Sequence, residues 1–332
     1  MQTARPVTSD LERTSGPTFR SRAYRNALER IERFARDRTA TILIEGESGT
    51  GKTRVARHLH QRSPRASGPF HSVVLSTLDD SLASSELFGH VTGAFTDARR
   101  NRAGHFVSAN GGTLFLDEIG KASRAVQQKL LHAAEYGEIR AVGSDRDIRV
   151  DVRIVLASNI SLDDLVEQGE FLPDLFARVA TFRVVLPPLR ERRVDIPLLV
   201  EEYVAKHAPQ CGYADPPSVD PALMRALQSA SWPYNLRQLD ATVHRILVDA
   251  DGAAAIALDH CTDDLSYLRE VAGVGAALDA DRVDSAIARA GSIAGAARLL
   301  GVDRTTVHRF QRRRWSSSLE SVAPRTADAN GV

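Results

Sequence analysis

One short segment, Gly46–Thr53, limits what this chain can fold into more than any other. It reads Gly-Glu-Ser-Gly-Thr-Gly-Lys-Thr and matches the pattern G-x-x-x-x-G-K-[ST] of a phosphate-binding loop. The apolar run 40–44 predicts a buried strand before it, and 54–60 predicts a helix after it. The backbone N–H groups of such a loop and the positive end of the helix bind phosphate. We therefore predict that Lys52 reaches the β- and γ-phosphates of a nucleotide and that the Thr53 hydroxyl coordinates Mg²⁺.

A second predicted strand, 112–116, ends in two carboxylates, Asp117 and Glu118. Downstream of a phosphate-binding loop, this arrangement predicts that Asp117 holds the Mg²⁺ shell and that Glu118 orients the attacking water as a base. The alternative for an isolated Asp-Glu pair is the start of a helix, which also favours carboxylates. Asn159 follows the predicted strand 152–157. It is a candidate sensor of the γ-phosphate, and the alternative for it is an ordinary turn.

Predicted strands and helices alternate up to Pro188. Such alternation is typical of an α/β fold, here a three-layer nucleotide-binding domain with a mostly parallel sheet. No strand is predicted after Pro188, where three helices predict a small helical domain. The remaining predicted strands are 72–75 and 182–186, and the main predicted helices are 21–35, 125–136, 196–206, 221–230 and 236–250.

The C-terminal unit is a candidate DNA-binding element. Residues 293–300 have helical apolar spacing, 301–303 predict a tight turn that ends in an N-cap, and 304–314 predict a second helix. Between 281 and 315 eight arginines and three aspartates give a net charge of +5, which favours contact with a phosphate backbone. We predict a helix-turn-helix whose second helix enters the major groove with Val307 and Phe310 facing inward; the alternative is a solvated basic helix. The residues predicted to contact DNA are Arg304, Thr305, Thr306, His308, Arg309, Arg312 and Arg313.

Composition excludes several other classes of protein. Hydrophobic residues make up 43% and charged residues 26%, as in a soluble globular protein, and no apolar run approaches the ~20 residues that a membrane span needs. No signal peptide is visible at the N-terminus. Two cysteines cannot form a disulfide framework or a zinc site and fit a reducing compartment, so we expect a cytoplasmic protein. Without a matching acidic or cysteine cluster, His58 and His60 are expected to be surface residues rather than metal ligands.

A series of motifs also runs through the chain in a fixed order. They are Gly46–Lys52, Glu86–His90 (ELFGH), Gly93–Thr96 (GAFT), Gly112–Glu118 (GTLFLDE), Leu186–Arg192 (LPPLRER), Asp195–Pro197 (DIP) and Trp232–Arg237 (WPYNLR). Together they resemble the central AAA+ domain of bacterial enhancer-binding proteins, the sigma-54-dependent transcriptional activators. The terminal unit resembles the Fis-type helix-turn-helix of the same family, and the resemblance covers about residues 18–315.

The resemblance implies an AAA+ P-loop α/β domain with a helical lid and self-assembly into a ring, commonly a hexamer, with ATP bound between subunits. It implies that ATP and Mg²⁺ are cofactors, and that hydrolysis of ATP to ADP and phosphate remodels sigma-54 RNA polymerase holoenzyme. It also implies binding to DNA at an upstream, enhancer-like site. Arg178 falls on a trans-acting arginine finger, Arg237 on the sensor II arginine of the lid, and Thr96 on the key threonine of the sigma-54 contact loop.

These assignments complete the candidate site. The catalytic residues are Glu118 and Arg178. The ATP-binding residues are Gly46, Glu47, Ser48, Gly49, Thr50, Gly51, Lys52, Thr53, Asp117, Asn159 and Arg237, and Thr53 and Asp117 are also the Mg²⁺ ligands. The sigma-54 contact loop is Gly93, Ala94, Phe95, Thr96, Asp97 and Ala98.

The chain departs from the family pattern at three positions. Asp97 replaces the second glycine of the contact loop, Leu172 stands at the family's first arginine finger, and Val74 stands where a strand asparagine is usual. These changes keep two alternatives open. One is a sigma-54-independent DNA-binding regulator that uses ATP as an assembly ligand with weak or no hydrolysis, and the other is an accessory subunit of a mixed ring.

The expected organisation is a flexible tail (1–17), an AAA+ α/β nucleotide-binding subdomain (18–190), a helical lid subdomain (191–265), a linker (266–280), a helix-turn-helix DNA-binding domain (281–316) and a disordered tail (317–332). Residues 1–17 are too few for a sensory domain of typical size. We therefore expect control by a separate regulatory protein, by the abundance of the chain itself or by a paralogue in trans.

Overall fold

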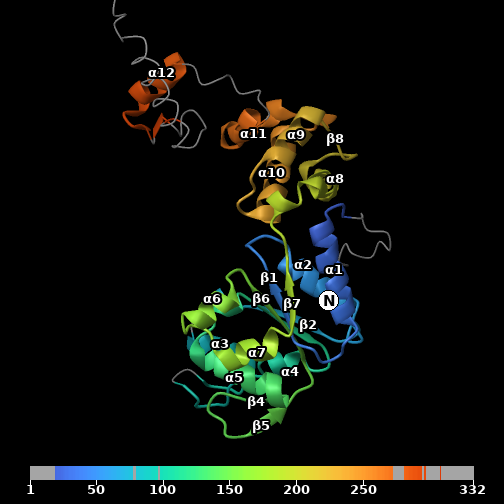
Figure 1. Cartoon of the computed structure of the whole chain (residues 1–332), viewed down its shortest axis with the longest axis vertical. Helices are drawn as coiled ribbons and strands as arrows, with labels where there is room; N and C mark the ends of the chain where they lie inside the picture. The colour runs from blue at the N-terminus through green and yellow to red at the C-terminus, as the bar shows by residue number, and fades with distance from the viewer. Residues whose placement is uncertain are drawn as a thin grey trace, which may run out of the picture. The chain divides into compact units, whose positions relative to one another are not determined.

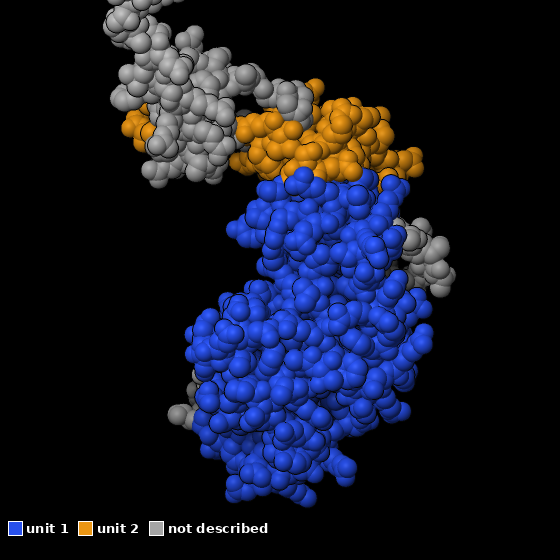
Figure 2. Space-filling view, in the orientation of Figure 1, with its two compact units in different colours: residues 1–200, 231–241 blue, residues 201–230, 242–332 orange. Residues whose placement is uncertain are grey.

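The computed structural model describes residues 19–77, 80–95, 98–271, 280–293, 295–296 and 307. The chain divides into two compact units, which Figure 2 distinguishes by colour. Unit 1 is built from residues 1–200 and 231–241, and unit 2 is built from residues 201–230 and 242–332. The motifs of the phosphate-binding loop, the carboxylate pair and the Trp232–Arg237 segment therefore all belong to unit 1.

Unit 1 is built on a five-stranded parallel sheet in the order β2-β3-β6-β1-β7. The strands are β1 (Ile42–Glu45), β2 (Phe70–Val74), β3 (Thr113–Asp117), β6 (Arg153–Ser158) and β7 (Phe182–Val185). Each lies within two residues of its predicted ends, because a short run of mostly apolar residues indicates a strand. The predicted α/β fold is confirmed.

Helices cover both faces of this sheet (Figure 1). Alternate side chains of a strand point to opposite faces, so Ile42 and Ile44 join one core cluster and Leu43 joins the other. The first cluster packs against α1 (Arg22–Ala35) and α2 (Lys52–Gln61). The second packs against α3 (Asp80–Phe88), α4 (His105–Ser108), α5 (Arg124–Tyr136), α6 (Leu162–Glu167) and α7 (Pro173–Val179). The three layers expected from the sequence are present.

Helix α1 is fixed at both ends. The Ser21 hydroxyl accepts a hydrogen bond from the Tyr24 N–H and caps its start. At its end, the fully buried Arg153 of β6 donates to the carbonyl oxygens of Phe34 (2.6 Å) and Ala35 (3.1 Å). Burial lowers the pKa of the Arg153 guanidinium to about 10. The otherwise unpaired carbonyls of the last turn are thus satisfied by a side chain of the sheet.

Unit 2 consists mainly of helices. Parts of α8 (Ile196–His207) and α10 (Asn235–Asp249) belong to it, together with α9 (Pro221–Ser229) and α11 (Ser266–Val271). The three helices predicted here are confirmed to within two residues at each end. Asp220 caps α9 by accepting from the N–H groups of Ala222 and Leu223, and Pro221 occupies its first position. Residues 266–271, the start of the expected linker, form α11.

Two features of the fold differ from the sequence prediction. A hairpin of β4 (Glu138–Arg140) and β5 (Asp147–Arg149) was not predicted, because all of β5 is exposed and its residues are largely charged. The prediction of no strand after Pro188 is wrong, since β8 (Ser218–Val219) pairs with β9 (Ala255–Ile256). Strands of two residues are too short to show an alternating pattern. Short 3₁₀ helices complete the chain at Leu75–Thr77, Ile119–Lys121, Leu189–Glu191, Arg193–Asp195, Ala208–Cys211, Leu258–His260 and Asp263–Leu265.

The expected DNA-binding unit is described only in part. Helix α12 (Ala280–Ala290) is present, and Val307 is helical and buried, as predicted. The predicted DNA contacts Arg304, Thr305, Thr306, His308, Arg309, Arg312 and Arg313, like Phe310, lie outside the described residues. Among the helices that the structure describes, none combines the length and the apolar character needed to cross a bilayer.

Candidate nucleotide-binding site

The three polar motifs of the sequence meet at one edge of the sheet. Strands β1, β6 and β3 are neighbours and parallel, so the residues that follow them lie at the same end. Glu45 pairs in register with Ser158, and the Gly46 N–H donates to the Ser158 carbonyl oxygen (3.2 Å). The structure therefore brings together the glycine-rich loop, the Asp117–Glu118 pair and Asn159, as the sequence predicts.

Only glycine fits at the middle of the loop. Gly49 has φ +78°, in the left-handed region, and a Cβ there would lie 2.2 Å from the Tyr234 carbonyl oxygen. Gly51, with φ +101°, occupies the N-cap of α2. Thr50 between them is fully buried. The loop is thus tightly curled at the positive end of a helix, which is the geometry that binds an anion.

Lys52, the first residue of α2, is buried within this loop. Its Nζ donates to the carbonyl oxygens of Gly46 (2.6 Å) and Glu47 (3.0 Å). Burial lowers the pKa of Lys52, the negative charges of Asp117 and Glu118 raise it, and Arg237 lowers it further. The ammonium group is therefore within electrostatic reach of the acidic pair at the end of β3.

The acidic pair sits in a constrained turn. The Asp117 carboxylate accepts from the Glu118 N–H (2.9 Å), and Glu118 has φ +59°, which is unusual for a residue other than glycine. A 3₁₀ helix does begin after Glu118, so the helix-start alternative is also realised. Such strain is common at functional sites.

The donors expected for Mg²⁺ fit that ion. A threonine hydroxyl and one carboxylate, with the phosphates of a nucleotide, form the oxygen set that Mg²⁺ prefers. Thr53 is exposed in the first turn of α2 and Asp117 is half-buried at the end of β3. No group of three or more His, Cys, Asp or Glu side chains that could hold a metal ion occurs among the described residues.

The expectation that His60 lies on the surface is wrong, since it is buried and its Nδ1 lies 2.9 Å from the Thr113 hydroxyl.

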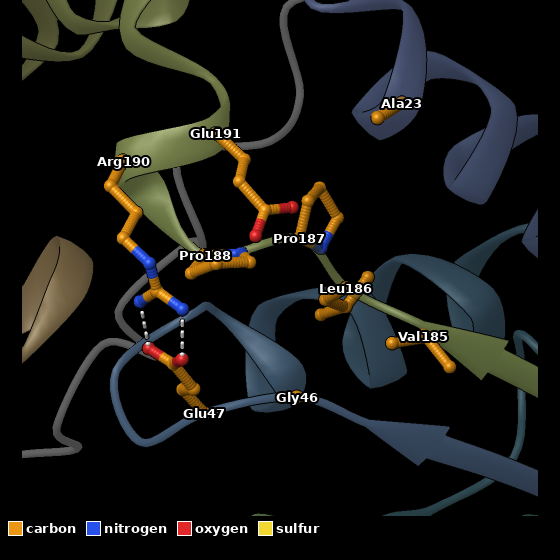
Figure 3. A pocket seen from close by; sticks show the side chains of 9 residues that line it. All are labelled: Ala23, Gly46, Glu47, Val185, Leu186, Pro187, Pro188, Arg190 and Glu191. Carbon is orange, nitrogen blue, oxygen red and sulfur yellow. Dashed lines mark hydrogen bonds and ion pairs between the residues drawn. The ribbon is translucent and has the colours of Figure 1, made fainter.

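A pocket of about 380 Å³ adjoins the loop (Figure 3). Its walls are mostly apolar, and the ion pair between Arg190 and Glu47 lies at one side. An apolar cleft with a few polar groups is typical of a small-molecule site. The residues that line it are Ala23, Gly46, Glu47, Val185, Leu186, Pro187, Pro188, Arg190 and Glu191.

Several residues that contact the loop were not predicted as site residues. The fully buried Arg192 donates to the Thr50 carbonyl oxygen (2.9 Å), and Arg190 donates twice to the Glu47 carboxylate (2.8 and 2.7 Å). Hydrogen bonds from Arg190, which have the larger effect, and from Asn235 hold the pKa of Glu47 below its usual range. Predicted Arg237 donates to the Ser48 hydroxyl (3.2 Å). The motifs Leu186–Arg192 and Trp232–Arg237 are visible in the sequence, but their pattern does not show that Arg190, Arg192 and Asn235 reach the loop.

Arg178, the predicted trans-acting finger, is exposed on α7 and donates to the Ala134 carbonyl oxygen (3.2 and 3.0 Å). The side chain of Leu172, the N-cap of α7, packs partly buried against the core. Val74 ends β2 in register with Asp117 and is 39% exposed. Of the two apolar residues that depart from the family pattern, Leu172 thus contacts the core and Val74 lies at an exposed strand end.

The predicted contact loop is closed at its base. The Gly93 N–H donates to the Ala98 carbonyl oxygen (2.8 Å), and the Phe95 ring is 43% exposed and lies 4.9 Å from the His90 ring. Thr96 and Asp97 of this loop lie outside the described residues. An exposed aromatic side chain next to them is available to a partner.

Comparison with known proteins identifies related chains. Residues 18–185 match the model of the Sigma-54 interaction domain, and residues 190–274 match that of an AAA+ ATPase lid domain. The Nif-specific regulatory protein of Herbaspirillum seropedicae is 44% identical over 225 residues, which cover 68% of this chain and 41% of that protein. The anaerobic nitric oxide reductase transcription regulator NorR of Salmonella paratyphi C is 46% identical over 214 residues, covering 64% and 42%.

Solved structures of similar fold are also known. NtrX from Brucella abortus in complex with ADP has a TM-score of 0.69 at 30% identity, and covers 90% of this chain and 69% of that chain. Its complex with ATP has a TM-score of 0.68 at 33% identity, and covers 90% and 68%. The chain spans about two fifths of the length of the curated relatives that it matches.

Proposed function

Because this chain belongs to the Sigma-54 interaction domain family of AAA+ proteins, we propose that it hydrolyses ATP in a ring and thereby remodels sigma-54 RNA polymerase at promoters. One observation carries the proposal. The buried ammonium of Lys52 lies in a curled glycine loop and within electrostatic reach of Asp117 and Glu118. That combination of a phosphate cradle and a base is what cleavage of a terminal phosphoryl group requires.

Within one subunit each group has a distinct role. The N–H groups of the loop and Lys52 bind the β- and γ-phosphates, and the pocket beside Gly46 takes the base of the nucleotide. Glu118 orients a water molecule toward the γ-phosphorus and accepts its proton as the bond to ADP breaks. Thr53 and Asp117 hold Mg²⁺, which neutralises the charge on the phosphate oxygens. Asn159 follows β6, the strand between β1 and β3, and senses the γ-phosphate.

A neighbouring subunit completes the reaction site. Arg178 is exposed on α7, so its guanidinium can exchange its hydrogen bonds to the Ala134 carbonyl oxygen for contacts with the ATP of the next subunit in a ring. Arg237 adds a second cation from the same chain. A γ-phosphate held by two subunits ties hydrolysis to ring geometry, and that geometry moves the loop 93–98 against sigma-54.

The other proposed partners follow from the sequence. The unit 281–316 binds an upstream DNA site through its basic second helix and tethers the ring near the promoter. We place the protein in the cytoplasm, where its RNA polymerase partner works.

A second candidate function is favoured by two side chains. Leu172 and Val74 are apolar where polar groups are usual in the family, and neither can stabilise charge in the transition state. On this account the chain binds ATP as an assembly ligand, hydrolyses it weakly or not at all, and regulates transcription without sigma-54. A subunit of a mixed ring that lends Arg178 to a partner's site is a variant of the same idea.

Transcription from a sigma-54 promoter in a purified system decides between these candidates. Wild-type protein with ATP is expected to yield open complexes, and Lys52→Ala is expected to yield none, because its phosphate cradle lacks the cation. Arg54→Ala, on the same helix but outside the loop, serves as a control for loss of a positive charge. Equal transcription from this promoter with and without ATP hydrolysis would refute the proposal.

A further inference from the structure

The carboxamide of Asn235 connects three segments that are far apart in the sequence. Asn235 is fully buried and begins α10. Its Nδ2 donates to the Ser48 carbonyl oxygen (2.9 Å) and to the Glu47 carboxylate (3.2 Å). Its Oδ1 accepts from the Leu189 N–H (2.7 Å). Since the Leu189 N–H can only donate and the Ser48 carbonyl can only accept, the orientation of the amide is determined by its partners.

The same side of the loop is held at two further points. The Leu236 N–H donates to the Gly49 carbonyl oxygen (2.9 Å), and the Arg192 guanidinium donates to the Thr50 carbonyl oxygen (2.9 Å). Three successive carbonyl groups of the loop therefore point outward to fixed donors. In a trans peptide the N–H points opposite to the C=O, so the N–H groups of Gly49 and Gly51 point away from Asn235 and Arg192.

We propose that Asn235 is a positioning residue that holds the phosphate-binding loop in the conformation its ligand needs. The inference rests on the nucleotide-binding part of the proposed function and deepens it. Asn235 does not touch the nucleotide; it fixes the peptide planes whose N–H groups do. Preorganisation of this kind lowers the cost of ordering the loop on binding, and it acts on ADP and ATP alike. Loss of Asn235 therefore raises KM and leaves kcat nearly unchanged.

The backbone of Asn235 supports this role. Its φ is +51°, in the left-handed region that asparagine tolerates better than most residues. Substitution by glycine keeps that backbone free of strain and removes only the carboxamide. Substitution by aspartate keeps the shape and the acceptor to Leu189, but places an anionic oxygen against the Ser48 carbonyl and the Glu47 carboxylate.

Calorimetric titration of ADP into the full chain tests the proposal. Asn235→Asp and Asn235→Gly are each expected to weaken ADP binding by at least about tenfold, since a buried hydrogen-bonded donor is lost. The double variant Glu47→Gln/Asn235→Asp is expected to bind ADP more tightly than Asn235→Asp, because an amide at position 47 donates to the new carboxylate. Asn110→Asp is the matched control. Its side-chain oxygen accepts from the Asp151 N–H (2.7 Å) away from the loop, and we expect unchanged affinity.

The outcomes separate this inference from the proposed function. Thermal unfolding without nucleotide identifies any variant that does not fold, and Asn235→Gly then replaces Asn235→Asp in the comparison. If wild type binds ADP no better than Lys52→Ala, the nucleotide site itself is refuted. If wild type binds far better than Lys52→Ala while both folded Asn235 variants match wild type, only the positioning role is overturned. A fall in kcat with unchanged KM would also overturn it.

Discussion

At the scale of single residues, two charged groups of the candidate site, Lys52 and Glu118, lie in different surroundings. Lys52 is buried and bonded to carbonyl oxygens, whereas Glu118 is half-buried in a left-handed turn beside Asp117. The first is suited to hold phosphate in every state of the reaction. The second is suited to act only when a water molecule attacks the γ-phosphorus and gives up its proton. The two groups should therefore affect binding and turnover differently.

Glu118→Gln is expected to keep nucleotide affinity and to lower kcat by roughly 10²–10⁴-fold, because the amide retains the shape of the side chain but cannot accept a proton. Steady-state ATP hydrolysis gives kcat, and titration with ADP gives affinity. Lys52→Ala is the contrasting variant and is expected to lose affinity. A Glu118→Gln protein that hydrolyses ATP at the wild-type rate would show that another group is the base.

At the scale of elements, the sequence predicted what depends on local pattern. The five strands of the sheet were found because each is a short apolar run, and the loop and carboxylate pair were found because they follow such runs. The β4–β5 hairpin was missed because its second strand, Asp147–Arg149, is exposed and polar. Asn235 received no role because its contacts with Ser48 join residues separated by 187 positions. Contacts over such distances carry no local signature.

The hairpin also bears on the contact loop. A Cβ at Gly143, in the turn between β4 and β5, would lie 2.7 Å from the Ala94 Cβ, so the turn and the loop are packed closely. Gly143→Ala is expected to displace the loop at a cost of about 1–3 kcal/mol. If the substitution destabilises the loop conformation that binds sigma-54 by this amount, affinity for sigma-54 drops by about 5- to 150-fold, and ATP binding is retained.

Gly169→Ala is the matched control for this prediction. Gly169 has φ +75°, close to the +78° of Gly143, but nothing lies within 4 Å of its added Cβ. Both variants carry the same backbone strain and differ in steric contact. Capture of the chain by immobilised sigma-54 is the measurement. Equal loss in both variants would mean that backbone strain, and not displacement of the loop, is responsible.

At the scale of the whole molecule, the central claim is that one ATP is hydrolysed by residues from two subunits. Glu118 belongs to the acidic pair beside the loop of its own chain, while Arg178 is exposed on α7 and bonded to Ala134. A subunit is therefore expected to be inactive alone, and hydrolysis per subunit is expected to rise with protein concentration as rings form. Two variants, each lacking one of these two side chains, can test this claim.

The most direct test is ATP hydrolysis by an equal mixture of Arg178→Ala and Glu118→Gln proteins, measured over a range of concentrations beside each variant alone. In a mixed ring, the Glu118 of one variant meets the Arg178 of the other, so some sites are intact. We predict that the mixture hydrolyses ATP faster than the sum of the separate variants, and increasingly so as concentration rises. A mixture that never exceeds that sum, with wild type active under the same conditions, would contradict a site shared between subunits.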